Sequence, residues 1–121
     1  MEIIIVKKND RDIAIIRSDE IVITDVQSAL DLMATIRYES GCSRILMPKE
    51  VITEDFFRLS TKLAGDILQK FINYQVKLAI VGDFSVYTSR SLKDFIYESN
   101  SGKDIFFLAD ERTATEVLSK V

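Results

Sequence analysis

The sequence predicts an α/β fold in which an N-terminal β-hairpin is followed by alternating helices and strands. Short runs rich in isoleucine and valine recur along the chain, separated by segments whose apolar residues have helical spacing. Two such runs at the start are joined by a short polar turn, which favours an antiparallel hairpin. Helices between the later strands imply right-handed crossovers. We therefore expect a largely parallel, mixed sheet of about 4–5 strands with about 4 helices.

The first elements are the two strands of the hairpin. We expect them over residues 2–7 and 12–17, with the polar turn Lys8–Arg11 between them. A third short run of β-branched residues, 21–23, leads directly into the first helix. The length of 121 residues is typical of one domain, so residues 1–121 are expected to form a single domain.

The first helix should begin at Thr24, because Thr24 and Gln27 have the spacing of a capping box. Apolar residues recur after it at helical spacing, and Gly41 is expected to end the helix near residue 39.

A short strand over residues 44–47 should end at Pro48, which has no amide donor. The longest helix is expected over residues 54–74, with Thr53 as its N-cap. One side of this helix is apolar. On the other side Lys62 and Asp66 have the spacing of an ion pair.

The last third of the chain repeats this alternation. Residues 76–81 read as a buried strand, and a polar connection over residues 83–91 leads into a helix that ends at Asn100. Residues 105–108 form the last expected strand, and Asp110 is the expected N-cap of a final helix.

Composition excludes several classes of function. The chain has 16 Lys and Arg against 19 Asp and Glu, and the resulting net charge of −3 argues against a nucleic-acid partner. It has no histidine, so Ser-His-Asp and Cys-His catalysis are excluded, and we expect no metal or other cofactor. The single Cys42 cannot form an internal disulfide and is expected to be buried and inert. Neither a membrane-spanning segment nor a signal peptide is visible, so we expect a cytoplasmic protein.

The order of the predicted elements resembles that of the STAS domain (sulfate transporter and anti-sigma-factor antagonist). Regulatory STAS domains carry a phosphorylatable serine at the start of the helix after the third strand. The matching turn here, residues 51–55, has no serine, and its only hydroxyl is on Thr53 beside two acidic residues. We therefore expect Thr53 to be a helix cap rather than a phosphorylation site.

A second resemblance covers residues 24–110 and rests on local sequence. The stretches 54–57, 63–74, 78–84 and 91–100 are similar to those of an uncharacterised bacterial family of small cytoplasmic proteins. That family is a domain of unknown function, so the resemblance implies no activity.

The connection after the strand at 76–81 is the first candidate site. It runs from the carboxyl end of a strand to the start of a helix, where open α/β sheets bind ligands. Asp83, Ser85, Ser89 and Arg90 could hold a carboxylate or phosphate group, or could form a plain surface loop. Asp83 could also join Glu50 or Asp110 in a carboxylate cluster, although such residues more often cap turns.

The second candidate site is the polar side of the long helix. Its residues could form a docking surface for another protein, or simply a solvated helix face: Phe56, Arg58, Lys62, Asp66 and Gln69. The resemblance to STAS regulators favours docking, so our leading hypothesis is a non-catalytic protein-interaction module. The alternative is a small anionic ligand-binding protein, or a weak enzyme, that uses the 82–91 loop. An exposed Phe56 would favour the partner, and a pocket beneath the loop would favour the ligand.

Overall fold

A computed structural model of the chain, which describes all 121 residues, confirms the α/β prediction. The hairpin strands β1 (Glu2–Lys8) and β2 (Arg11–Arg17) are antiparallel. Strands β3 (Arg44–Pro48), β4 (Lys77–Val81) and β5 (Ile105–Leu108) continue the sheet in parallel with β2. The five strands lie in chain order, β1-β2-β3-β4-β5.

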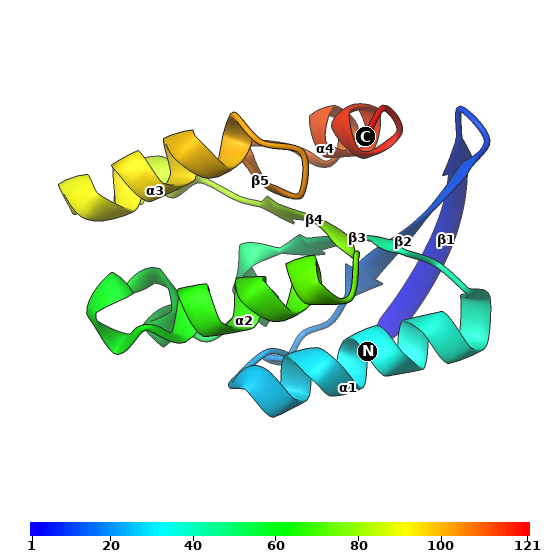
Figure 1. Cartoon of the computed structure of the whole chain (residues 1–121), viewed down its shortest axis with the longest axis horizontal. Helices are drawn as coiled ribbons and strands as arrows, with labels where there is room; N and C mark the ends of the chain where they lie inside the picture. The colour runs from blue at the N-terminus through cyan, green and yellow to red at the C-terminus, as the bar shows by residue number, and fades with distance from the viewer.

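Four α-helices cover the sheet on both faces (Figure 1). They are α1 (Val26–Ser40), α2 (Leu63–Asn73), α3 (Arg90–Asn100) and α4 (Glu111–Leu118). Each parallel connection moves one strand further in the same direction. Because such crossovers are right-handed, α1, α2 and α3 all pack on one face, and only α4 packs on the other.

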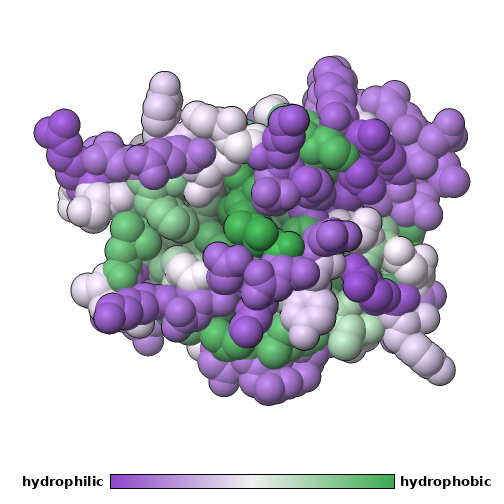
Figure 2. Space-filling view, in the orientation of Figure 1, coloured by the Kyte–Doolittle hydropathy of each residue, from purple (hydrophilic) through white to green (hydrophobic).

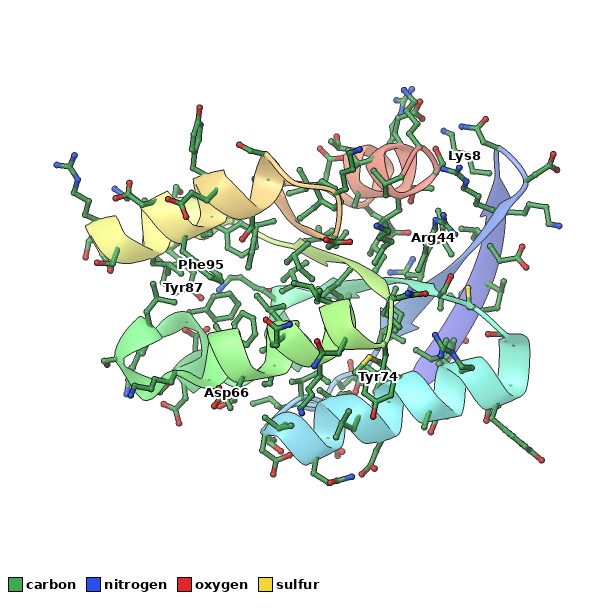
Figure 3. All side chains as sticks on the ribbon, viewed as in Figure 1. Lys8, Arg44, Asp66, Tyr74, Tyr87 and Phe95 are labelled. Carbon is green, nitrogen blue, oxygen red and sulfur yellow. The ribbon has the colours of Figure 1, made fainter.

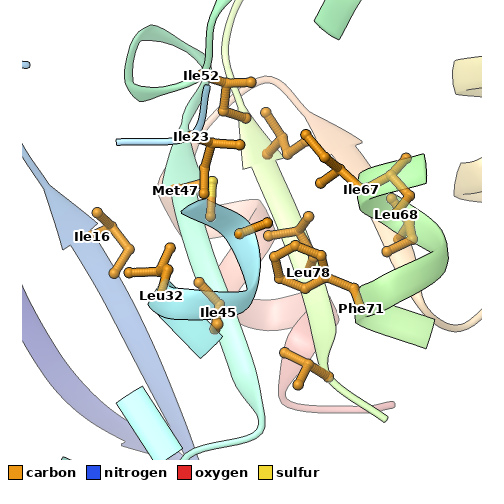
Figure 4. Close-up of a cluster of buried hydrophobic side chains, with 14 of the residues drawn as sticks. Ile16, Ile23, Leu32, Ile45, Met47, Ile52, Ile67, Leu68, Phe71 and Leu78 are labelled. Carbon is orange, nitrogen blue, oxygen red and sulfur yellow. The ribbon is translucent and has the colours of Figure 1, made fainter. Parts of the chain in front are cut away.

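Alternation along the strands divides the core between these two faces. The larger cluster of buried residues joins Ile16, Ile45 and Leu78 to α1, α2 and α3 (Figure 4). The smaller cluster joins the intervening residues, such as Ile15 and Leu46, to α4. Successive side chains of a strand point to opposite faces, so the buried runs of β2, β3 and β4 serve both clusters.

The N-terminal third differs from prediction at the start of α1. Residues 21–23, which precede it, make only one isolated bridge, between Ile23 and Ile52. The cap of α1 is Asp25 rather than Thr24: the Asp25 carboxylate accepts from the Ser28 amide at 2.8 Å, and the Ser28 hydroxyl accepts from the Asp25 amide at 3.0 Å. Gly41 ends α1 with a left-handed φ of 70°, as predicted.

The largest error concerns the start of the long helix. Residues 54–57 and 59–61 form two 3₁₀ turns, and α2 begins only at Leu63. The Thr61 hydroxyl donates to the Asp55 and Arg58 carbonyl groups at 2.8 Å and accepts from the Leu63 amide at 3.2 Å. These bonds satisfy the main chain locally and compete with a continuous helix.

Candidate functional site

A charged and aromatic cluster lies at the carboxyl edge of the parallel strands. Lys49 follows β3 directly, and Tyr87 lies in the connection after the neighbouring β4. Lys49 Nζ donates to the Tyr87 hydroxyl at 3.1 Å, and that hydroxyl donates to Glu54 at 3.1 Å. Lys49 Nζ also lies 3.6 Å from Glu54 Oε1. The parallel register of β3 and β4 therefore brings together residues that are 38 positions apart.

The backbone of Gly82 makes room for the Lys49 side chain. A β-carbon at position 82 would lie 2.7 Å from Lys49 Cδ and 2.8 Å from its Cγ, so no larger residue fits there without moving the lysine. The Lys49 side chain is only 17% exposed. Its ammonium lies 5.0 Å from the centroid of the Tyr87 ring and 5.8 Å from that of Phe57, within the range of cation–π attraction.

The contacts within this cluster set the protonation states of Lys49 and Tyr87. Burial lowers the pKa of Lys49, but the bond to Tyr87 and the charge of Glu54 outweigh it, so the pKa is raised overall. Burial raises the pKa of the Tyr87 phenol, against the opposing effect of Lys49. At neutral pH Lys49 is therefore charged and Tyr87 is neutral, and neither is a ready proton acceptor.

A cleft of about 490 Å³ opens beside Tyr87, between the start of α3 and the 3₁₀ turns that precede α2. Tyr87 projects into the space between these two segments (Figure 3). Figure 2 shows hydrophobic surface there between hydrophilic rims. The lining alternates apolar and hydroxyl side chains, with one arginine: Phe57, Arg58, Leu59, Ser60, Val86, Tyr87, Thr88, Ser89, Ser91 and Leu92.

The start of α3 contributes polar hydrogens to this cleft. Ser89 is the N-cap of α3, and its hydroxyl oxygen accepts from the Leu92 amide at 3.2 Å. The amide of Ser91, which also lines the cleft, belongs to the first turn, where an α-helix provides no acceptor for it. The Phe57 and Tyr87 rings stack with centroids 5.1 Å apart and form an aromatic wall.

Of the four residues predicted in the 82–91 loop, only Ser89 lines the cleft. The Asp83 carboxylate accepts from the Ser85 amide at 3.0 Å and from its hydroxyl at 2.5 Å, which lowers the pKa of Asp83 and closes a local turn. Arg90 is exposed and does not line the cleft. Sequence reasoning missed Lys49, whose position directly after a predicted strand was the available signal.

The predicted docking face does not form as one helical surface. Phe56 is 1% exposed and belongs to the core, so it is not available to a partner as we expected. Arg58 and Lys62 precede α2, whereas Asp66 and Gln69 lie on it. Lys62 and Asp66 do not form the predicted ion pair, because Lys62 has a left-handed φ of 64° and lies outside the helix.

The remaining predicted residues do not form a further site. Asp110 caps α4 by accepting from the Thr113 amide at 2.7 Å, a bond that lowers the pKa of Asp110. No group of three or more acidic, cysteine or histidine side chains is arranged to hold a metal ion, so Asp83, Glu50 and Asp110 do not form the carboxylate cluster considered above. Thr53 makes no side-chain cap bond. Cys42 is buried, as predicted, and burial raises the pKa of its thiol.

A second hollow, of about 360 Å³, lies between α1 and residues 74–76. Its lining is mainly apolar, and its charged side chains are engaged. Asp31 accepts from the Gln27 side chain at 2.9 Å, and Arg37 donates to the Tyr74 carbonyl at 3.1 Å. The cleft beside Tyr87 offers more hydroxyl groups than this hollow, and its one arginine, Arg58, is likewise paired, 3.5 Å from Asp55.

Comparisons with known proteins give one match. A family model described as a domain of unknown function (DUF4180) matches residues 8–118. Neither the curated proteins nor the solved structures include a match, so the resemblance to STAS domains stays a prediction. Measured by length and apolar character, none of the helices could cross a membrane.

Proposed function

We propose that this chain, which belongs to the DUF4180 family, binds a small anionic molecule in the cleft beside Tyr87. The observation that supports this proposal most directly is the charge of the lining. The chain carries 19 Asp and Glu residues, yet none of the lining residues is acidic and one is arginine. In an acidic protein, such a cleft offers a local environment that favours negative charge.

The start of α3 supports recognition of an anionic group. The N-terminus of a helix carries partial positive charge and free amide hydrogens, which suit a carboxylate or phosphate. Ser89 and Ser91 line the cleft at this point, and Ser60 and Thr88 add further hydroxyl donors. The ligand group that we expect here therefore has several oxygen acceptors.

The aromatic wall supports an apolar or planar body for the same ligand. Phe57 and Tyr87 stack on each other, and the bonds of Tyr87 to Lys49 and Glu54 hold its ring in place. An orientation fixed in advance reduces the entropy lost when a ligand binds. We therefore favour a molecule with one anionic end and one apolar or aromatic end.

Burial of Phe56 makes us prefer ligand binding over the protein-interaction module that the sequence first suggested. The docking face has lost its only large apolar residue, and apolar anchors supply most of the affinity of protein interfaces. Non-catalytic binding is the role we favour, because the residues beside the cleft include no free general base.

Titration with inorganic phosphate, phenyl phosphate and neutral phenol tests this proposal. We expect phenyl phosphate to bind most tightly and to shift the amide resonances of Ser89 and Ser91, which line the cleft. At 100 times its dissociation constant, a ligand of the native state should stabilise the protein by about 2.7 kcal/mol. If none of the three probes shifts these amides at millimolar concentration, the proposal is wrong.

Two matched substitutions locate the binding site. Ser89→Asp keeps a good N-cap for α3 but places a negative charge in the cleft, so phenyl phosphate should bind at least about tenfold more weakly with unchanged melting temperature. Arg90→Gln changes an exposed residue outside the cleft and should leave the affinity unchanged. Equal losses in both variants would place the ligand elsewhere.

A further inference from the structure

The two edges of the sheet are protected to different degrees. At the β5 edge, the Asn100 side chain binds both the amide and the carbonyl group of Phe107. The Phe107 amide donates to Asn100 Oδ1 at 2.7 Å, and Asn100 Nδ2 donates to the Phe107 carbonyl at 3.0 Å. The carboxamide thus occupies the place of a further strand, and this edge is closed to pairing.

The β1 edge has no such cover. β1 spans seven residues and forms the outer edge of the sheet, with β2 as its only neighbour (Figure 1). Lys8 and Arg11 flank a turn in which Asn9 and Asp10 have positive φ values of 52° and 61°. Such a two-residue hairpin closes on a hydrogen-bonded pair, and bonded pairs then alternate along the strands. Ile3, Ile5 and Lys7 therefore turn their amide and carbonyl groups outward.

The side chains of β1 are only partly covered. Ile5 is 42% exposed, and Ile4 and Val6 are half-buried against the smaller core cluster. A seven-residue edge strand with three consecutive isoleucines is a template for pairing with another strand. After Glu2 at the start of β1, Lys7 is the only exposed charged residue of the strand. Lys8 is half-buried and bonded to Glu116.

Charges at the two ends of β1 indicate which strand fits. When β1 is paired antiparallel with a copy of itself about Ile5, all seven residues find partners. Glu2 then lies opposite Lys8 of the second copy at both ends, and Ile4 lies opposite Val6 on the same face. The outward groups of Ile3 also meet those of Lys7, as an antiparallel ladder requires. Pairing about Lys7 would instead place two lysines opposite each other.

We propose that β1 pairs with β1 of a second copy of this chain about a twofold axis at Ile5, which joins the two five-stranded sheets into one. Glu116 keeps Lys120 as an ion-pair partner at 3.3 Å when Lys8 turns towards Glu2 of the second copy. Because the contact is isologous, it closes after two copies and does not propagate into a fibre.

Sedimentation equilibrium of the full chain over a range of concentrations tests this pairing. We expect a dimer in the unmodified protein. Ile5→Lys places two like charges at the twofold axis and should leave only monomer at the same concentrations. Ile21→Lys, at an isoleucine that is 53% exposed but outside the sheet, should leave the dimer intact. A monomer at every concentration, or an Ile5→Lys variant that still forms dimers, would overturn the proposal.

Charge exchange tests the register. Glu2→Lys alone and Lys8→Glu alone each place like charges at both ends, so each should dimerise about tenfold more weakly. An equimolar mixture of the two variants opposes unlike charges again and should recover the dimer. The Lys8–Glu116 ion pair is absent from the Lys8→Glu chain whether that chain is alone or mixed, so its loss cannot explain a recovery that occurs only in the mixture. A mixture no more associated than its components would exclude this register.

Discussion

At the scale of single residues, Asn100 shows how one side chain can bond the main-chain groups that a neighbouring strand would otherwise bond. Its carboxamide presents an acceptor and a donor in the order of a peptide group, and both are bonded to the nearly buried Phe107. The sequence placed Asn100 at the end of a helix, which is correct. Its second role depends on the position of α3 beside β5, and no local pattern reveals that position.

We predict that Asn100→Ala lowers the free energy of unfolding by about 1–2 kcal/mol, because two main-chain groups of Phe107 lose their partners. Urea denaturation measures the change. Asn73→Ala is the matched control, since Asn73 is exposed and bonds only to the Gln69 side chain, and its effect should stay within about 0.5 kcal/mol. Equal effects in the two variants would show that the bonds to Phe107 contribute nothing special.

At the scale of elements, patterns with a local cause were predictable from the sequence. The hairpin, the end of α1 at Gly41 and the strands β3, β4 and β5 all have such causes: a polar turn between two β-branched runs, a left-handed glycine and short apolar runs. The start of α2 was not predictable, because the apolar spacing continues from Phe57 into the helix. Lys62 breaks the helix although it is neither glycine nor asparagine.

In the candidate site too, residues with a local role were predictable from the sequence and contacts between distant segments were not. Ser89 was predictable, since a serine at the start of a helix has a local role as cap. The contact between Lys49 and Tyr87 was not, because it depends on the order of strands in the sheet. The burial of Phe56 likewise follows from the 3₁₀ turn that replaces the expected helix.

The left-handed backbone at Lys62 leads to an element-scale prediction. Lys62→Gly should raise the free energy of unfolding by about 0.5–1 kcal/mol, because glycine adopts positive φ without the steric cost that other residues carry. The same change at Lys93, an exposed position inside α3, should lower it by about 1 kcal/mol. Thermal and urea unfolding of both variants give the signs. A decrease at both positions would contradict the strain assigned to Lys62.

At the scale of the whole molecule, α4 alone covers the second face of the sheet. It has eight residues, a length at which an isolated helix is unstable in water. Ala114 and Leu118 pack on the sheet, and Arg44 from β3 donates to the Leu118 carbonyl at 3.0 Å (Figure 3). Arg17 from β2 adds a bidentate pair with Glu111, with both distances 3.0 Å. Tertiary contacts therefore maintain α4.

We predict that Leu118→Ala lowers the free energy of unfolding by about 2–4 kcal/mol, since Leu118 is 0% exposed and its removal leaves a cavity beneath α4. Val117→Ala removes a smaller and partly exposed side chain of the same helix and should cost about 1 kcal/mol or less. Guanidinium denaturation distinguishes the two. A small effect at Leu118 would mean that α4 contributes little to the second face.

The order of the strands also determines how the chain can fold during synthesis. Every strand pairs with the one made immediately before it, so strands can add to the sheet in the order in which they leave the ribosome. The three helices made between the strands cover one face as they emerge. The other face, with Ile13, Ile15 and Phe106, stays open to chaperones and to other nascent chains until residues 111–118 follow. The period of greatest risk of aggregation therefore comes late, when the sheet is complete and α4 has not yet docked.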